Sequence, residues 1–216
     1  MDPLRTAIAL VPLASYLLLL GLVNLRGRPL VTTGANDLAT LCVALSGVVF
    51  VGPLELFRPE PATIKLGAYV WLLLLGLYWL CVSLAAMILR PRLTIYNITL
   101  EQLRPAVAEA VSQVDPDARW AGDSLVLPRL QVQLHLDSFA SMRHASLVSS
   151  GGNQSLEGWW RLKRALIRSL QDLSVGPNPR SVTFLTGALV LFGLSVAGLV
   201  AAPEQVAQAW ASLTSF

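Results

Sequence analysis

Residues 6–24 read TAIALVPLASYLLLLGLVN, a run without a charged side chain that begins directly after Arg5. A helix of about 20 apolar residues crosses the roughly 30 Å hydrocarbon core of a bilayer. The run leads into Asn24, Leu25 and Arg26 without the small-residue pattern at which a signal peptide is cleaved. We therefore expect it to be a retained transmembrane helix.

Three further apolar runs have the same character, and each is bounded by Arg, Pro or Asp. Together the four runs predict a multi-pass integral membrane protein, in which an all-α bundle of transmembrane helices lies in the lipid. The expected spans are residues 6–24, 38–56, 66–89 and 181–202.

The composition supports a lipid environment. Hydrophobic residues make up 54% of the 216 residues and charged residues only 13%, against about 25% charged residues in an ordinary soluble domain. Basic residues comprise 14 Arg and 2 Lys, a bias that indicates a bacterial source and hence the inner membrane. Cys42 and Cys81 both lie in apolar runs, where free cysteine behaves as a small apolar residue, so we expect no disulfide, no zinc site and no cofactor.

The composition changes between Arg90 and Arg180, where nearly all of the regular charge of the chain lies. Roughly 90 residues are enough for one small domain with its own core. We therefore expect a soluble α+β domain at 91–180, inserted between a membrane segment at 1–90 and a last segment at 181–216. The last segment would hold the fourth span and a short interfacial tail after Pro203.

The soluble domain is predicted to follow the order β-α-β-β-β-β-α, with a mostly antiparallel sheet whose apolar face the two helices cover. Its clearest strand alternates apolar residues such as Leu134 with polar residues such as Gln133. The expected elements are a strand at 93–98, a helix with a Thr99 and Gln102 capping box, a hairpin over 119–127, strands at 130–137 and 143–149, and a helix from Ser155 to about Leu173.

The distribution of basic residues near the spans predicts the orientation. With four spans, both termini lie on one side of the membrane and the soluble domain lies on the other. Positively charged residues are more frequent in cytoplasmic loops, so we expect a cytoplasmic domain and termini outside. The domain side holds Arg26, Arg28, Arg90, Arg92 and Arg180, whereas the terminal side holds Arg5, Arg58 and Lys65.

Two histidines and an aspartate are the candidate metal ligands. His135 and Asp137 share the outer face of one strand, and a hairpin that directs Ala145 inward would place His144 opposite Asp137. Two imidazoles and a carboxylate could bind a metal ion or pass a proton. The alternative is that these are solvated polar residues on the outer face of a half-buried sheet.

The closing helix of the domain combines aromatic and basic residues. Because this helix ends close to the fourth span, its basic face could lie on anionic headgroups with tryptophan at the interface. The alternative is an ordinary amphipathic helix that packs on the sheet and keeps its basic face in water. The residues of this candidate membrane interface are Trp159, Trp160, Arg161, Arg164 and Arg168.

The spans themselves offer few polar groups. Gly193, Ala197 and Ala201 lie four residues apart in the fourth span, a spacing that lets helices approach closely within the chain or between subunits. Glu55 lies about one turn from the end of the second span, so we interpret it as an interfacial residue reaching headgroup water, not as an ion site.

The sequence favours a non-enzymatic scaffold or accessory subunit whose cytoplasmic domain binds a protein partner or a second copy of the chain, and no nucleic acid. It contains no glycine-rich phosphate loop, nucleophile elbow, HExxH or CxxC motif. Two alternatives remain open, namely a channel or transporter component and a membrane-bound enzyme or sensor that uses a metal ion.

Overall fold

The computed structural model of this protein describes residues 2–56, 65–67, 69–139, 142–152 and 154–214. The chain forms two compact units. The helical unit comprises residues 1–20, 38–88 and 182–216, and the sheet unit comprises residues 21–37 and 89–181. Two of the boundaries fall within the first two long helices, so the last turn of the first helix and the first turn of the second belong to the sheet unit.

Four helices of the chain are long and apolar enough to cross a membrane: α1 (Pro3–Leu25), α2 with the turn that follows it (Gly34–Leu54), α4 (Tyr69–Ile88) and α7 (Arg180–Ala201). Their ends agree with the expected spans to within a few residues. Only 11–17% of the residues in their apolar windows are buried, so most of their side chains are at least partly exposed. A twelve-residue helix, α8 (Pro203–Thr214), ends the described chain.

Small residues are buried where these helices approach one another. Ala14 of α1, Ala44 of α2 and Ala188 of α7 are fully or almost fully buried. A Cβ atom on Gly47 of α2 would lie 1.9 Å from the carbonyl oxygen of Ile8 in α1. Backbones can approach this closely only where side chains are absent or small, which explains why the buried positions are alanine and glycine.

The second long helix changes its hydrogen-bonding pattern near its end. α2 proper covers Gly34–Val49, and a π-type turn, η1 (Phe50–Leu54), follows it. Pro53 lies in this turn. Proline has no backbone N–H to donate and its ring crowds the preceding turn, so local widening of the helix at this position has an evident cause.

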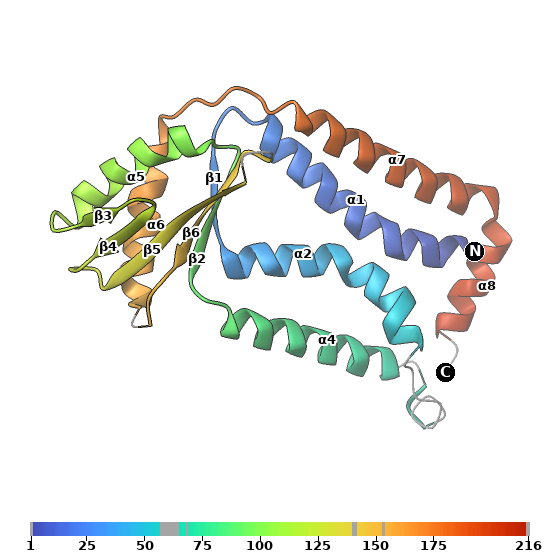
Figure 1. The fold of residues 1–216 in the computed structure, drawn as a ribbon. Helices are drawn as coiled ribbons and strands as arrows, with labels where there is room; N and C mark the ends of the chain where they lie inside the picture. Colours follow the sequence, from blue (N-terminus) through green and yellow to red (C-terminus); the bar gives the residue numbers. More distant parts are fainter. Residues whose placement is uncertain (1, 57–64, 68, 140–141, 153, 215–216) are drawn as a thin grey trace. The chain divides into compact units, whose positions relative to one another are not determined.

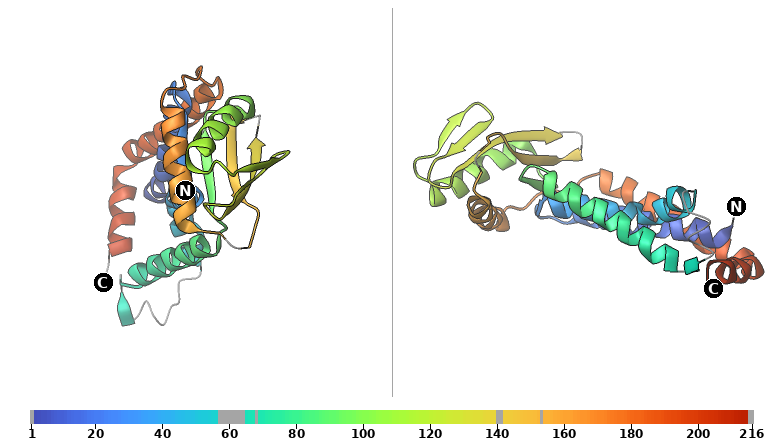
Figure 2. Two further views of the ribbon diagram at one scale, coloured as in Figure 1. Left: turned by 90° about the vertical axis from the view of Figure 1, so that its left-hand side faces the viewer. Right: turned by 90° about the horizontal axis from the view of Figure 1, so that it is seen from below.

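The sheet unit contains a six-stranded sheet in the order β1-β2-β6-β5-β4-β3, in which every neighbouring pair is antiparallel. The helices α5 (Leu100–Val114) and α6 (Leu156–Gln171) pack side by side on one face of it (Figures 1 and 2). The strands are β1 (Leu30–Thr33), β2 (Arg92–Tyr96), β3 (Arg119–Ala121), β4 (Ser124–Leu127), β5 (Val132–Phe139) and β6 (His144–Ser149).

Local sequence signals account for most of these elements. Thr99 and Gln102 form the expected capping box of α5, in which the Thr99 N–H donates to Gln102 Oε1 at 3.3 Å. The Ser155 hydroxyl accepts a hydrogen bond from the Gly158 N–H at the start of α6. Gly122 turns the β3–β4 hairpin with φ of +62°, a conformation that glycine adopts without steric cost.

The edge strand β1 is the element that the sequence analysis did not predict. Residues 30–33 come from the short connection between α1 and α2, and they pair antiparallel with β2, with Leu30 opposite Tyr96. The expected order β-α-β-β-β-β-α describes β2 to α6. The first connection adds one more strand beside β2, so the sheet unit extends beyond the expected range 91–180.

Candidate functional site

A cluster of polar side chains lies on the face of the sheet that α5 and α6 do not cover. Alternation along β2 places Arg92, Thr94 and Tyr96 on this face, and the register places His144 of β6 directly opposite Tyr96. The first turn of α2 brings Asp37 to the same place. We call Asp37, Arg92, Thr94, Tyr96 and His144 the polar cluster.

Asp37 is the acceptor that joins α2 to the sheet. Its carboxylate accepts a hydrogen bond from the Tyr96 hydroxyl and forms an ion pair with Arg92, whose Nη2 lies 3.5 Å from Asp37 Oδ2. The His144 ring stacks on Tyr96 with 5.0 Å between ring centroids and 14° between planes. Charge-assisted hydrogen bonds are the stronger ones in proteins, so the cluster holds the start of α2 to β2 and β6.

Three atoms of the polar cluster are buried without a hydrogen-bond partner: Arg92 Nε, Thr94 Oγ1 and His144 Nε2. Buried polar atoms in folded proteins are nearly always hydrogen-bonded. These three atoms lie on the adjacent strands β2 and β6, and their hydrogen-bonding capacity is not used within the described residues. The cluster therefore combines an acid, a base and an arginine on one face of the sheet.

Burial lowers the pKa of His144 below its ordinary value of 6.5, and the Arg92 charge acts in the same direction. The carboxylates of Asp37 and Asp137 oppose this shift. The lowered pKa keeps the imidazole neutral near pH 7, so His144 can accept a proton only under acidic conditions.

The expected metal ligands do not converge in the described residues, which contain no group of three His, Cys, Asp or Glu side chains able to hold a metal ion. The register places Ser146, not His144, opposite Asp137, and it places Val148 opposite His135. The His135 Nδ1 atom lies 3.2 Å from the Ser124 hydroxyl. The expected position of His144 opposite Asp137 was wrong by two residues, because β5 continues to Phe139 and pairs that residue with His144.

The candidate membrane interface on α6 divides into one core residue and four exposed residues. Trp159 is 5% exposed, belongs to the hydrophobic core and donates its indole N–H to Gln154, so it is not available to a membrane surface. Trp160 and the three arginines are exposed. Arg161 pairs with Glu157 one turn away, and Lys163 lies over the Trp160 ring.

The expected packing stripe of the fourth span faces outward in this chain. Gly193, Ala197 and Ala201 are exposed, and a Cβ atom on Gly193 would meet nothing within 4 Å. The packed face of α7 instead contains Ala188 and Ser195, which are almost fully buried. Both sets have helical spacing, and only the packing of α7 on its neighbours distinguishes them.

Glu55 forms an ion pair with Arg5, with 2.7 Å between Glu55 Oε1 and Arg5 Nη1. Arg5 also lies 3.3 Å from Asp2. Arg5 is near the start of α1 and Glu55 follows the π-type turn, so both belong to helix ends. Glu55, which the sequence indicated to be an interfacial residue, is thus paired with an arginine.

Three asparagines tie the helix ends into the sheet unit. Asn178 Nδ2 donates to Asn24 Oδ1 at 2.9 Å, and the Asn178 N–H donates to the Asn24 carbonyl at 3.1 Å. Asn97 Nδ2 donates to the Arg26 carbonyl at 2.7 Å. All three side chains are buried. Sequence reasoning missed this joint, although an asparagine at the end of an apolar run and another just before the fourth run were visible signals.

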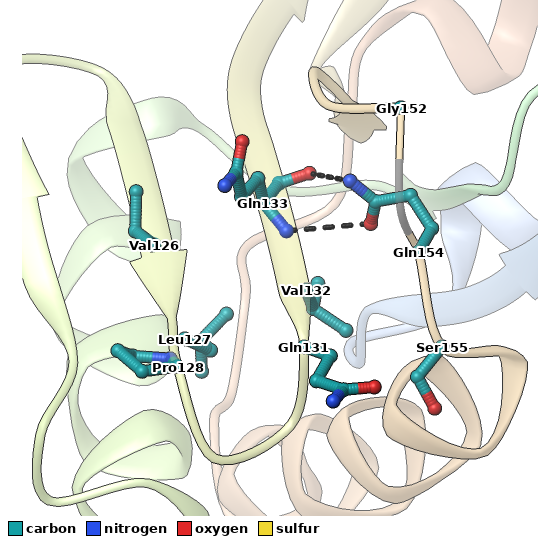
Figure 3. A pocket seen from close by; sticks show the side chains of 9 residues that line it. All are labelled: Val126, Leu127, Pro128, Gln131, Val132, Gln133, Gly152, Gln154 and Ser155. Carbon is teal, nitrogen blue, oxygen red and sulfur yellow. Dashed lines mark hydrogen bonds between the residues drawn. The ribbon is translucent and has the colours of Figure 1, made fainter.

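A hollow of about 740 Å³ lies beside β5 (Figure 3). The Gln154 side chain extends the sheet there, since its amide accepts from the Gln133 N–H at 3.3 Å and donates to the Gln133 carbonyl at 3.1 Å (Figure 3). Its lining includes no titratable side chain: Val126, Leu127, Pro128, Gln131, Val132, Gln133, Gly152, Gln154 and Ser155. The hollow therefore offers shape and amide groups but no acid, base or nucleophile beyond a serine hydroxyl that caps α6.

Comparison with protein-family models, with curated proteins and with solved structures gave no match for this chain.

Proposed function

We propose that this chain is an integral protein of the bacterial inner membrane that acts as a non-enzymatic scaffold or accessory subunit. In this proposal the four long apolar helices span the bilayer and the sheet unit faces the cytoplasm. The sheet unit then binds a protein partner, which includes a second copy of the chain.

The proposal rests on one observation: the acidic side chains named below hold loops, helices and strands together through hydrogen bonds and ion pairs. Buried Asp115 accepts hydrogen bonds from the backbone N–H groups of Asp117, Arg129 and Leu130 and so fixes two loops. Asp37 holds α2 to the sheet. The remaining ion pairs of the sheet unit join Arg104 with Asp123, Arg129 with Asp117 and Arg161 with Glu157. Catalytic sites need acids or bases poised toward a cleft, whereas these groups stabilise structure.

The open face of the sheet supplies the surface for a partner. On β5 the exposed residues Gln133, His135 and Asp137 alternate with buried Leu134 and Leu136. At the end of the same strand the exposed aromatic ring of Phe139 is available to a partner. Interfaces combine aromatic side chains with a polar rim, and this face has that composition.

Site-specific photocrosslinking tests the partner proposal in intact cells. A photoreactive amino acid at Asp137 should give one discrete protein adduct, because that residue lies on the open face. The same amino acid at Ala108, an exposed position on α5, is the matched control and should give none. A chain that yields no adduct at Asp137, or equal adducts at both positions, would contradict the proposed docking face.

Cysteine labelling tests the proposed orientation. In a chain that lacks Cys42 and Cys81, a cysteine at Ser212 should react with a membrane-impermeant maleimide in intact cells. A cysteine at Ser150 should react only after lysis. The opposite pattern would place the sheet unit outside and remove a cytoplasmic partner. Arg58, which counts toward the terminal side in the charge comparison, lies outside the residues that the structure describes.

No described observation favours the transporter alternative, since Glu55 is paired with Arg5 and conduction requires polar groups along a path through the spans.

A further inference from the structure

We propose that the sheet unit binds one anionic phospholipid in a hollow between the loop after α1 and the end of α6, with Arg26 and Arg28 holding the lipid phosphate. This inference rests on the proposed membrane location. We call this hollow of about 240 Å³ the arginine hollow, and its lining is Arg26, Arg28, Pro29, Leu30, Val31, Ile167, Leu170 and Gln171.

The position of the arginine hollow follows from the continuity of the chain. α1 covers Pro3–Leu25, and a helix of this length extends about 35 Å, slightly more than the roughly 30 Å of hydrocarbon. Arg26 follows its last residue directly. The two arginines therefore lie at the depth of the lipid headgroups, and this placement depends only on α1 itself.

The charges of the arginine hollow are uncompensated. Within the described residues neither Arg26 nor Arg28 takes part in an ion pair, and both side chains are exposed. The lining contains no acidic residue. Arginine presents a planar set of N–H donors that matches phosphate oxygens, so an anion at this place gains contacts and replaces no internal partner.

The backbone that carries these arginines is fixed. The Arg26 carbonyl accepts from Asn97 Nδ2 at 2.7 Å, and the Gly27 carbonyl accepts from the Val175 N–H at 2.9 Å. Two residues after Arg28, Leu30 begins the pairing of β1 with β2. A ligand therefore meets a loop that is already ordered, and little backbone entropy is lost on binding.

The apolar lining distinguishes a lipid from a free phosphate. Five of the lining residues are apolar, namely Pro29, Leu30, Val31, Ile167 and Leu170. A free anion would leave this wall in contact with water, whereas the glycerol and the first methylene groups of a lipid would cover it. The exposed basic residues Arg164 and Arg168 are not part of this lining and instead line a second hollow with Val114 and Leu130.

Lipid titration of the purified full chain tests the site. Detergent-solubilised protein is titrated with phosphatidylglycerol or phosphatidylcholine, and lipid adducts are counted by native mass spectrometry. Wild type should bind the first phosphatidylglycerol at least about tenfold more tightly than phosphatidylcholine, since each arginine near a headgroup contributes about a factor of five. The variant Arg26→Gln/Arg28→Gln should lose this preference.

Arg164→Gln/Arg168→Gln is the matched control, because it removes the same charge from exposed positions on the same unit. It should keep the preference. Equal loss in both variants would show general attraction to basic charge, and loss only in the α6 variant would move the site to that helix; either result overturns the proposal. Competition by inorganic phosphate at equal concentration would overturn the identification of a lipid.

Two further measurements separate the possible failures. Arg26→Lys/Arg28→Lys keeps the charge and should retain part of the preference, and urea unfolding of each variant shows that the sheet unit is intact. Alkaline carbonate extraction of cell membranes tests the membrane location itself. A chain that remains in the membrane without discriminating between the lipids overturns the site alone, whereas a chain released by carbonate overturns the proposed function as well.

Discussion

Gly158 in the first turn of α6 provides the sharpest test of how that helix meets the sheet. A Cβ atom at this position would lie 2.2 Å from the Leu130 carbonyl oxygen and 2.9 Å from Val132 Cγ2. The Leu130 backbone cannot easily move away, because its N–H donates to the buried carboxylate of Asp115. Gly158→Ala should therefore force a shift of α6 or of the loop before β5.

The expected magnitude follows from two opposing effects. Alanine is favoured over glycine in a helix by about 1 kcal/mol, whereas forcing an extra methyl group into a packed site costs about 1–3 kcal/mol and occasionally more. Because the clash is with a fixed backbone oxygen, we expect the upper end of this cost, about 3 kcal/mol. Less the gain of about 1 kcal/mol from alanine, the sheet unit should lose about 2 kcal/mol. With a urea dependence of about 2 kcal/mol/M for a small domain, the unfolding midpoint should fall by about 1 M.

Pulse proteolysis of the full chain in detergent and urea measures this midpoint. Gly152→Ala is the control, since a Cβ atom there would meet nothing within 4 Å and a loop glycine replaced without strain is neutral or slightly stabilising. A Gly158→Ala protein whose midpoint equals or exceeds that of wild type would show that α6 does not approach the Leu130 carbonyl as described.

Three further sets of variants test the core, the asparagine contacts at the helix ends and the polar cluster by the same assay. Leu134→Ala should cost about 2–5 kcal/mol because Leu134 is fully buried, whereas Gln133→Ala should cost less than about 0.5 kcal/mol; equal costs would disprove the register of β5. Asn178→Ala and Asn24→Ala should each cost about 1–3 kcal/mol, and a double mutant with fully additive costs would contradict their hydrogen bond. The unfolded chain takes up a proton at His144 below about pH 6.5, whereas burial lowers the pKa of this residue in the folded protein. The urea midpoint should therefore decrease as the pH is lowered from about 7 to about 5, and His144→Gln should make this decrease smaller. An equal decrease in the variant would contradict the burial of this imidazole.

The spacing of apolar residues predicted those elements of the sheet unit in which apolar residues lie on one face and polar residues on the other. The α5 positions Leu103, Val107 and Val111 are all buried, as their spacing indicates. Trp159 could have been assigned in the same way, because it continues the buried stripe of Leu162 and Leu166 at helical spacing. Its proximity to Trp160 suggested a membrane interface, but adjacent helix residues face different directions.

The elements that sequence reasoning missed depend on non-local pairing. β1 has only four residues, too few for a clear alternation, and its partner β2 begins about sixty residues later, across two apolar helices. The register of β5 and β6 depends on where the hairpin closes. Because β5 continues to Phe139, His144 pairs with that residue and not with Asp137, two residues earlier.

The pairing of β1 constrains the membrane arrangement independently of the count of basic residues. β1 lies between α1 and α2 and forms ladder partners with β2. If the apolar helices span a bilayer as proposed, the loop between the first two helices must therefore lie on the same side as the sheet unit. Asn24, Asp37 and Asn178 then join the end of α1, the start of α2 and the segment before α7 to that unit. In the proposed arrangement, a partner that displaces the sheet unit must also displace the ends of three helices or break buried hydrogen bonds.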